Sequence, residues 1–342
     1  ANTGTATDGG VASANPGQAI MIEGTNFDLT TDVVFVYSNA SGIRIERVVR
    51  PLAVNDDGTE IMVEVPIDAV TGVVRVVGDQ NATAATLQIV PTVDFVDLTS
   101  VSPTLAYFTL TGSGLIEGSD TVYTFGSETL VDISTSSSPV NAYNSNRTAT
   151  LSIDYSDGLF GSVTVTTEGG TSAPFTVGFT QIDSVALSGT PADTNEASAN
   201  TSQAITIVGT DLTTTTDLVV RYVDDSGNLQ TWLTNPISAA TDGTSATVEL
   251  PSWVNGAFGL QMVGAVNQPL LQIVPTISSL DVYSTNSVTF FGTGLLEGNN
   301  SQYNFSGDVQ VDPDAPTGPN VYSNGTRVNI SPAITFGMGQ FT

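Results

Sequence analysis

Side chains that could carry out chemistry are scarce in this sequence. The chain has no cysteine and no histidine, and all seven of its basic residues are arginine. Thiolate nucleophiles, imidazole bases, ordinary zinc sites and Schiff-base lysines are therefore excluded together. Neither a G-x-S-x-G elbow nor a Ser-x-x-Lys motif is present to activate a serine. We expect that the protein is not an enzyme. No cofactor is certain, and calcium is the one that the chain could bind.

Carboxylates in loops are the one group that suits a metal, because calcium takes six to eight oxygen ligands. No loop carries the acidic ladder of an EF-hand or a glycine-rich nonapeptide array, so a solvated turn is the alternative at each position. Two of the glutamates recur in the same Gly-Leu-x-Glu-Gly setting. The calcium candidates are Asp56, Asp57, Glu117, Asp120, Asp224, Asp225 and Glu297, and the segment 312–314 is a further candidate.

Asparagines in Asn-x-Ser/Thr sequons are candidates for glycosylation in an exported protein. About six sequons would arise by chance in a chain so rich in serine and threonine. The eight that occur therefore leave open whether any of them is glycosylated. The candidates are Asn39, Asn81, Asn146, Asn200, Asn299, Asn304, Asn324 and Asn329.

Two further groups of side chains could make contacts. Arg44, Arg47 and Arg50 form a basic cluster, which is either a solvated strand face or a local contact with an acidic neighbouring subunit. Trp232 and Trp253 could stack on the face of a sugar. These tryptophans favour an alternative function, that of a glycan- or receptor-binding module.

Charge restricts the partners of the chain. Its 34 acidic and 7 basic residues give a net charge of -27. A polyanion repels phosphate backbones and anionic headgroups, so neither nucleic acid nor the membrane surface is an expected partner. No apolar run approaches the roughly 18 residues that a membrane-spanning helix needs, so we expect no membrane insertion. Self-association, other surface proteins, glycans and cations remain as partners.

The elements that position these residues follow from an internal repeat. IMIEGTNF (20–27) recurs as ITIVGTDL (205–212), an offset of 185 residues (205 minus 20), and LQIVPT recurs from 87 at 271. We call this pattern type A. After each LQIVPT comes a second pattern, type B, in which residues 108–126 match residues 288–306 at an offset of 180 (288 minus 108). The order is A-B-A-B, and the predicted domains are 1–91, 92–181, 182–275 and 276–342.

Within each unit, short runs of alternating apolar residues are separated by turn signals every 8 to 12 positions. This period of two is typical of half-buried strands, and Asp57-Gly58, Asp242-Gly243 and Gly169-Gly170 favour hairpins. No segment sustains a helical period. The predicted fold class is all-β, with tandem sandwiches in an extended array that is stiffened at Pro91 and Pro275.

The early strands resemble the IPT/TIG branch of immunoglobulin-like domains, whose hallmark is a strand reading roughly G-x-x-(V/I)-x-I-x-G-x-N-F. The resemblance is most specific in the first third of each unit, and in type B it is looser, around Gly112, Gly114 and Gly126. It implies a fold more firmly than a function; members include receptor stalks, transcription factors and bacterial surface arrays. The matching residues of the first unit are Gly17, Ile20, Ile22, Gly24, Asn26 and Phe27, followed by Val34, Phe35 and Val36.

Alignment of the copies predicts that both ends are incomplete. The third unit is preceded by a first strand within 179–189 that the first unit lacks, and the fourth unit lacks the strand at 163–177 of the second. Either the chain is a window on a longer repeat protein, or neighbouring subunits donate the missing strands. Because the chain begins at Ala1 without a leader, both an exported mature protein and a cut segment fit. We therefore expect an extracellular, cell-surface structural or adhesive protein that forms a stalk, filament or surface layer.

Overall fold

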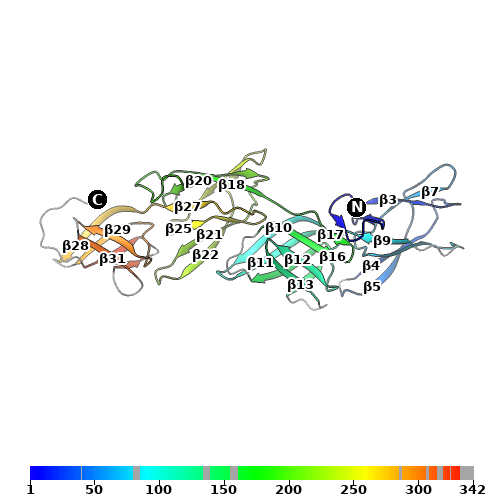
Figure 1. The fold of residues 1–342 in the computed structure, drawn as a ribbon, viewed down its shortest axis with the longest axis horizontal. Helices are drawn as coiled ribbons and strands as arrows, with labels where there is room; N and C mark the ends of the chain where they lie inside the picture. The colour runs from blue at the N-terminus through cyan, green and yellow to red at the C-terminus, as the bar shows by residue number, and fades with distance from the viewer. Residues whose placement is uncertain are drawn as a thin grey trace. The chain divides into compact units, whose positions relative to one another are not determined.

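The computed structural model describes residues 1–39, 41–79, 85–133, 139–154, 161–284, 287–305, 308–313, 319–323 and 325–331. These residues form strands and turns and contain no helix, which confirms the all-β prediction (Figure 1). Accordingly, no helix in this part of the chain is long and apolar enough to span a bilayer. The chain divides into two compact units, residues 1–100 with 104–176 and residues 101–103 with 177–342. Each unit contains one A-type and one B-type group of sheets.

The first A-type group packs a three-stranded sheet against a five-stranded one, in the orders β3-β7-β6 and β2-β9-β8-β4-β5. β2 runs parallel to β9, and the other pairs are antiparallel. Phe35 on β4 and Ile61 on β7 are buried in one core, so both sheets contribute to it. The strands are β2 (Ser13–Ala14), β3 (Ala19–Glu23), β4 (Val33–Ser38), β5 (Arg44–Val49), β6 (Ala53–Val54), β7 (Glu60–Glu64), β8 (Gly72–Val76) and β9 (Ala85–Ile89).

The first B-type group consists of the sheets β10-β11-β15-β14 and β1-β17-β16-β12-β13. Phe108 and Phe125 join the two sheets, with ring centroids 4.4 Å apart. The predicted Gly169-Gly170 hairpin connects β16 to β17. The strands are β1 (Thr5–Ala6), β10 (Thr92–Val101), β11 (Leu105–Ser113), β12 (Thr121–Phe125), β13 (Glu128–Asp132), β14 (Val140–Tyr143), β15 (Thr148–Asp154), β16 (Val163–Thr167) and β17 (Gly170–Thr171).

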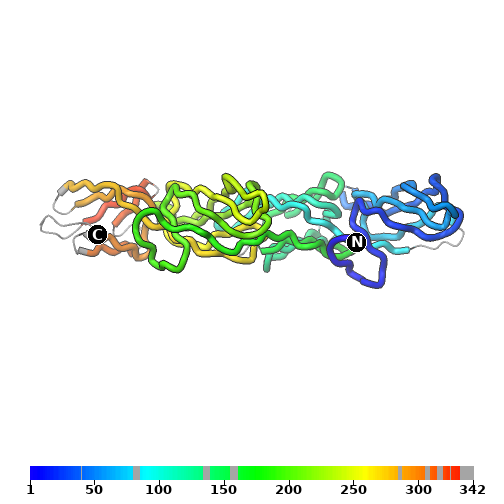
Figure 2. Tube along the Cα trace, turned by 90° about the horizontal axis from the view of Figure 1, so that it is seen from above, coloured from blue at the N-terminus to red at the C-terminus, as the bar shows by residue number. Residues whose placement is uncertain are grey.

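One strand of that B-type group, β1, comes from the N-terminal part of the sequence, far from the other strands of its sheet. Thr5 pairs with Thr171 and Ala6 with Gly170, so the N-terminal segment completes the edge of the second domain's sheet. Both views show the blue N-terminal end beside these strands (Figures 1 and 2). The segment therefore belongs to both sandwiches of the first unit.

The main segment of the second compact unit begins at residue 177 and enters β18, which pairs with β20. The A-type sheets are β18-β20-β24-β23, β19-β27-β25 and β22-β21-β26. The strands are β18 (Gly178–Asp183), β19 (Ala197–Ala199), β20 (Ala204–Thr210), β21 (Leu218–Val223), β22 (Leu229–Thr234), β23 (Ser238–Ala239), β24 (Ser245–Glu249), β25 (Ala257–Gly259), β26 (Gln261–Met262) and β27 (Leu270–Ile273).

The B-type group of the second unit has the sheets β28-β29-β33-β32 and β30-β31. Phe290 and Tyr303 bring these two sheets together in one core. Residues 332–342, which include part of the predicted incomplete end, lie outside the described residues. The strands are β28 (Thr276–Ser284), β29 (Ser287–Thr293), β30 (Ser301–Phe305), β31 (Asp308–Asp312), β32 (Asn320–Tyr322) and β33 (Arg327–Ile330).

The two A-type groups differ at one edge. In the third domain the sheet has four strands and β18 is the outermost, whereas in the first domain the equivalent sheet ends at β3. The sequence predicts this difference, because a first strand precedes the second A-type copy and not the first copy.

Candidate functional site

The predicted calcium ligands do not converge. In the described part of the chain, no three acidic side chains lie close enough together to hold a metal ion. Asp57 and Asp224 instead stabilise turns, since Asp57 accepts a hydrogen bond from the Thr59 hydroxyl and Asp224 accepts the amides of Ser226 and Asn228. Asp56 and Asp120 are exposed, and Asp225 accepts the amide of Gly325 at 3.3 Å.

Glu117 is buried inside the second domain, not in a solvated loop. Its carboxylate accepts the amide of Ala142 at 2.5 Å, and Asp132 accepts the amide of Gly118 at 2.7 Å. The two carboxylates thus fix the 113–120 loop onto β13 and β14. Burial raises the pKa of Glu117, as does the charge of Asp132, while the Ala142 amide opposes them.

The fourth domain repeats this arrangement. Glu297 accepts the amide of Val321 at 2.5 Å, and Asp312 accepts the amide of Gly298 at 2.9 Å. Desolvation by burial raises the pKa of the tyrosine beside each pair, Tyr123 or Tyr303, and the carboxylate charges add to it. Each carboxylate accepts a hydrogen bond from a backbone amide. Holding the loop in place is therefore a sufficient role for the repeated pair, without a bound metal ion.

The sequons divide by burial. Asn146 and Asn200 are buried, and their amide nitrogens donate to the carbonyl oxygens of other residues. Both side-chain nitrogens are thus already engaged in hydrogen bonds inside the folded protein. Asn299 and Asn304 are exposed, and Asn39 and Asn329 are half-buried. Asn81 and Asn324 lie outside the described residues.

The arginine cluster forms ion pairs within the first unit. Arg47 contacts Asp68 at 2.6 Å, and Arg50 contacts Asp32 at 3.3 Å. Arg44 pairs with Glu168 of the second domain, which lies across the junction between the two sandwiches. Exposed pairs of this kind contribute about 0–1 kcal/mol each. The Arg44 pair therefore adds little to the stability of the junction.

Three aromatic side chains gather in the third domain. The ring of Trp253 lies 4.2 Å from that of Tyr222 and 5.4 Å from that of Trp232, measured between centroids. All three are half-buried. At an offset of 185, their places in the first domain are held by Tyr37, Arg47 and Asp68 (Arg47 is 232 minus 185).

That equivalent trio is also in mutual contact. The Arg47 guanidinium lies 4.5 Å from the centroid of the Tyr37 ring and pairs with Asp68 at 2.6 Å. An ionic and aromatic contact in one copy therefore replaces an aromatic cluster in the other. Tyr37 and Tyr222 are the members that the two trios share.

Beside these trios lie the junctions between A-type and B-type domains. In the first unit, the Asn146 amide donates at 3.3 Å to the carbonyl oxygens of both Ser38 and Asp68. A Cβ at Gly169 would overlap the carbonyl oxygen of Ile89, so β16 and β17 approach the last strand of the first domain closely. Only glycine allows that approach.

The second unit joins its domains with different residues. The Asn255 amide donates at 2.8 Å to the carbonyl of Val223 and at 3.4 Å to that of Leu295 in the fourth domain. Asp225 accepts the Gly325 amide, also across the junction. Both compact units therefore have a buried asparagine that bridges their two domains.

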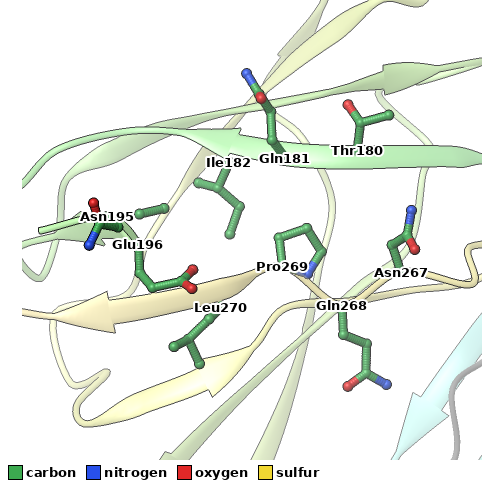
Figure 3. Close-up of a pocket in the computed structure, with 10 residues that line it drawn as sticks. Thr180, Gln181, Ile182, Asn195, Glu196, Asn267, Gln268, Pro269 and Leu270 are labelled. Carbon is green, nitrogen blue, oxygen red and sulfur yellow. The ribbon is translucent and has the colours of Figure 1, made fainter. Parts of the chain in front are cut away.

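A pocket in the third domain lies between β18 and the 267–270 segment (Figure 3). Glu196 is its one ionisable lining residue, and no aromatic ring lines it. Acid-base catalysis needs at least one more titratable or nucleophilic partner, and sugar stacking needs a ring face. The pocket therefore supports neither function. Its lining residues are Thr180, Gln181, Ile182, Asn195, Glu196, Ala197, Asn267, Gln268, Pro269 and Leu270.

No protein-family model matches the chain, and no curated protein matches it. One similar solved structure is a tetra-tandem repeat from the extending region of a large adhesion protein, with 14% identity, a TM-score of 0.19, and coverage of 94% of this chain and 89% of that one. Another, solved with a xylogluco-oligosaccharide, has 14% identity, a TM-score of 0.24 and coverage of 87% and 70%.

SGBP-B from a complex xyloglucan utilization locus in Bacteroides uniformis is also similar, with 15% identity, a TM-score of 0.20, and coverage of 69% of this chain and 83% of that one. All three TM-scores are below 0.5.

Proposed function

We propose that the protein is an extracellular, cell-surface structural and adhesive repeat protein of the IPT/TIG branch, which works by spacing and assembly and not by catalysis. The junctions carry this proposal. Asn146 in one unit and Asn255 in the other each hydrogen-bond across the boundary between an A-type and a B-type domain. A buried bond of this kind resists rotation, because breaking it leaves a desolvated polar group. Each unit thus becomes a preformed two-domain spacer.

The absence of histidine, cysteine and lysine and the charge of -27 support the same proposal. A strongly acidic surface favours solubility and discourages binding to nucleic acid or anionic membranes. The partners we propose are other copies of the chain or other surface proteins, and the assembly is a stalk, filament or surface layer. Strand donation between subunits is the means of assembly that suits an open sheet edge.

Electron microscopy of the native material tests this function. We expect rods, fibres or a lattice whose repeat matches whole two-domain units. Isolated compact particles at all protein concentrations would contradict the proposal. Cross-linking before imaging separates weak assembly from none.

The second candidate function is a glycan-binding module, favoured by the half-buried cluster of Tyr222, Trp232 and Trp253. Aromatic faces stack on the apolar faces of sugars. A glycan array with the purified chain tests it, with Trp253→Ala as the site variant. Tyr37→Ala removes the equivalent ring of the first domain and serves as the matched control. Binding that survives Trp253→Ala would contradict this candidate.

A further inference from the structure

Each B-type domain buries two carboxylates close together. In the second domain these are Glu117 and Asp132, which are 3% and 1% exposed. Each accepts a backbone amide, and no arginine among the described residues pairs with Glu117. Two like charges that share a desolvated site cannot both ionise cheaply, so such a site favours a bound proton.

Glu117 is the group on which this proton is expected. Burial is the main cause that raises its pKa, and the charge of Asp132 adds to it, while the Ala142 amide opposes both. The titratable groups that face Glu117 are Asp132 on β13 and Tyr123 on β12, and β14 faces it with the Ala142 amide. Tyr123 is fully buried and its pKa is raised, so its phenol stays neutral. Glu117 therefore changes its charge as the pH rises above 4.5.

The loop that carries this glutamate, between β11 and β12, also touches the first domain. Gly114 packs on Pro91, because a Cβ there would come within 3.2 Å of the proline Cα. Leu115 is fully buried and donates its amide to the carbonyl oxygen of Asn146 at 2.9 Å. Asn146 is the residue whose side chain bridges the two domains. The 113–120 loop thus connects the carboxylate pair to the junction.

The second unit makes the same connection with its own residues. Gly294 packs on Pro275, where a Cβ would come within 3.4 Å of the proline Cα. The carbonyl oxygen of Leu295 accepts the amide of Asn255, the bridging residue of this unit, at 3.4 Å. Glu297 follows on the same loop and is 3% exposed. In both units, therefore, a buried glutamate lies on the loop that contacts the junction.

We propose that each of these loops makes the junction of its unit depend on pH: a proton on Glu117, or on Glu297 in the second unit, holds the loop against the neighbouring A-type domain, and its loss loosens the junction. Once the proton leaves to solvent, two buried negative charges repel each other, and the loop must move to let water reach them. The inference rests on the proposed function and states what regulates the stiffness of each two-domain spacer.

The sign follows from the raised pKa of Glu117. The folded state binds this proton more tightly than the unfolded chain does, so the contribution of Glu117 to the closed junction is present below pH 4.5. It is lost as the pH rises through the raised pKa. The ratio of loosened to closed junctions should then grow by up to about tenfold per pH unit, which is the limit for one titrating group.

Distances between spin labels placed across each junction test the proposal on the full 342-residue chain. The chain has no cysteine, so labels attach only where one is introduced. Met21→Cys with Tyr107→Cys spans the first junction, and Ile237→Cys with Val309→Cys spans the second; all four side chains are exposed. We expect one narrow distance distribution for each pair at pH 4.5, and a second, broader population that grows towards about pH 8.

Two glutamine variants make each unit the control for the other. Glu117→Gln is neutral at every pH and keeps an oxygen for the Ala142 amide, so the first junction should stay narrow while the second still broadens. Glu297→Gln should give the reverse. Asp132→Asn removes the like charge and should move the transition of the first junction to lower pH, which a purely structural role of the loop would not do. This variant also tests the proposal if Glu117→Gln does not fold.

Equal broadening of both junctions in the Glu117→Gln variant would overturn the proposal, because the change would then come from the overall charge. Distributions that do not change with pH in the wild type would also overturn it. Narrowing at about pH 8 by calcium, but not by magnesium at the same concentration, would show that the pair binds a metal ion and not a proton.

The outcome is separate from that of the proposed function. If microscopy shows rods or fibres while the junctions do not respond to pH, the proposed function stands and this inference falls. Compact particles whose junctions loosen with rising pH would show the reverse.

Discussion

Positions 37, 47 and 68 show how one site in a fold can be filled by different chemistry. The first domain uses a tyrosine, an arginine and an aspartate, whereas the third uses Tyr222, Trp232 and Trp253 in the same places. Both sets are in mutual contact. A shared structural role therefore accounts for the two tryptophans before any ligand is invoked, and stability measurements separate that role from sugar binding.

Trp253→Ala should reduce the free energy of unfolding of the third domain by about 2–3 kcal/mol, which is less than the roughly 3–5 kcal/mol typical of a buried tryptophan because this one is half-buried. The double substitution Trp232→Arg with Trp253→Asp rebuilds the first domain's trio around Tyr222. It should recover part of the loss and make the stability salt-dependent. Urea unfolding followed by circular dichroism measures both. A double variant less stable than Trp253→Ala would contradict this reading.

Two carboxylates, one buried and one exposed, make stability depend on pH in opposite directions. The pKa of Glu117 is raised above 4.5, chiefly by burial, so the folded state binds this proton more tightly than the unfolded chain. Its contribution is therefore present below pH 4.5 and is lost as the pH rises through the raised pKa. Asp242 acts in the opposite direction: a hydrogen bond from the Thr244 side chain lowers its pKa below 3.8, and its contribution is lost as the pH falls through that lowered value.

We therefore expect the unfolding temperature to decline as the pH rises above 4.5, partly because the proton on Glu117 is lost. Glu117→Gln should flatten the decline above pH 4.5, by no more than about 1.4 kcal/mol per pH unit, which is the limit for one group. The exposed Glu64→Gln is the control. Thermal unfolding at a series of pH values measures this effect, and identical slopes in the two variants would disprove it.

At the scale of elements, the junction in each unit depends on one asparagine. The Asn146 side chain is 2% exposed and donates to two carbonyl groups of the neighbouring domain. Its own φ is +61°, in the left-handed region that asparagine and aspartate tolerate better than other residues. Asn146→Asp therefore keeps the backbone while it removes both donors.

The Asn146→Asp variant should destabilise the first unit by at least about 2 kcal/mol, because a carboxylate would then face two buried carbonyl oxygens. The first and second domains should also unfold in two separate steps and not in one. Asn304→Asp, on the exposed side of β30, is the matched control and should change little. Differential scanning calorimetry of the full chain reports both effects, and a single unshifted transition would rule out the bridging role.

At the scale of the whole molecule, charge dominates. Seven arginines cannot neutralise 34 carboxylates, and four of the seven are already in ion pairs within the first unit. The remaining acidic groups repel one another over about 10 Å at 0.1 M salt. Folding brings them together, so repulsion opposes the compact state until it is screened.

Raising sodium chloride from about 20 to about 300 mM should therefore raise the unfolding temperature. Calcium and magnesium at the same concentration should produce equal shifts, because no three acidic side chains converge in the described residues. A calcium shift several degrees larger than the magnesium shift would show a specific site and contradict this expectation. Scanning fluorimetry with both salts makes the comparison.

Much of the architecture follows from local pattern. Alternating apolar residues predict the strands, and the repeat predicts that β18 exists only before the third domain. Partners distant in sequence were not predictable in this way. The pairing of β1 with β17 joins segments with no matching pattern, and the burial of Asn146 depends on a neighbouring domain. A sequon or a loop carboxylate has the same sequence whether or not another element covers it, so the burial of Asn200 and Glu117 could not be predicted.

The pairing of β1 with β17 bears on the order in which the chain folds. Thr7 and Glu168, which are hydrogen-bonded at this contact, are 161 positions apart, so a ribosome must synthesise almost the whole first unit before β1 finds its partner. Loop closure of that length is slow compared with hairpin formation. Until then the nascent protein presents an unpaired β1 strand and an unfinished sheet. Both would be open to proteases, chaperones or a second nascent molecule.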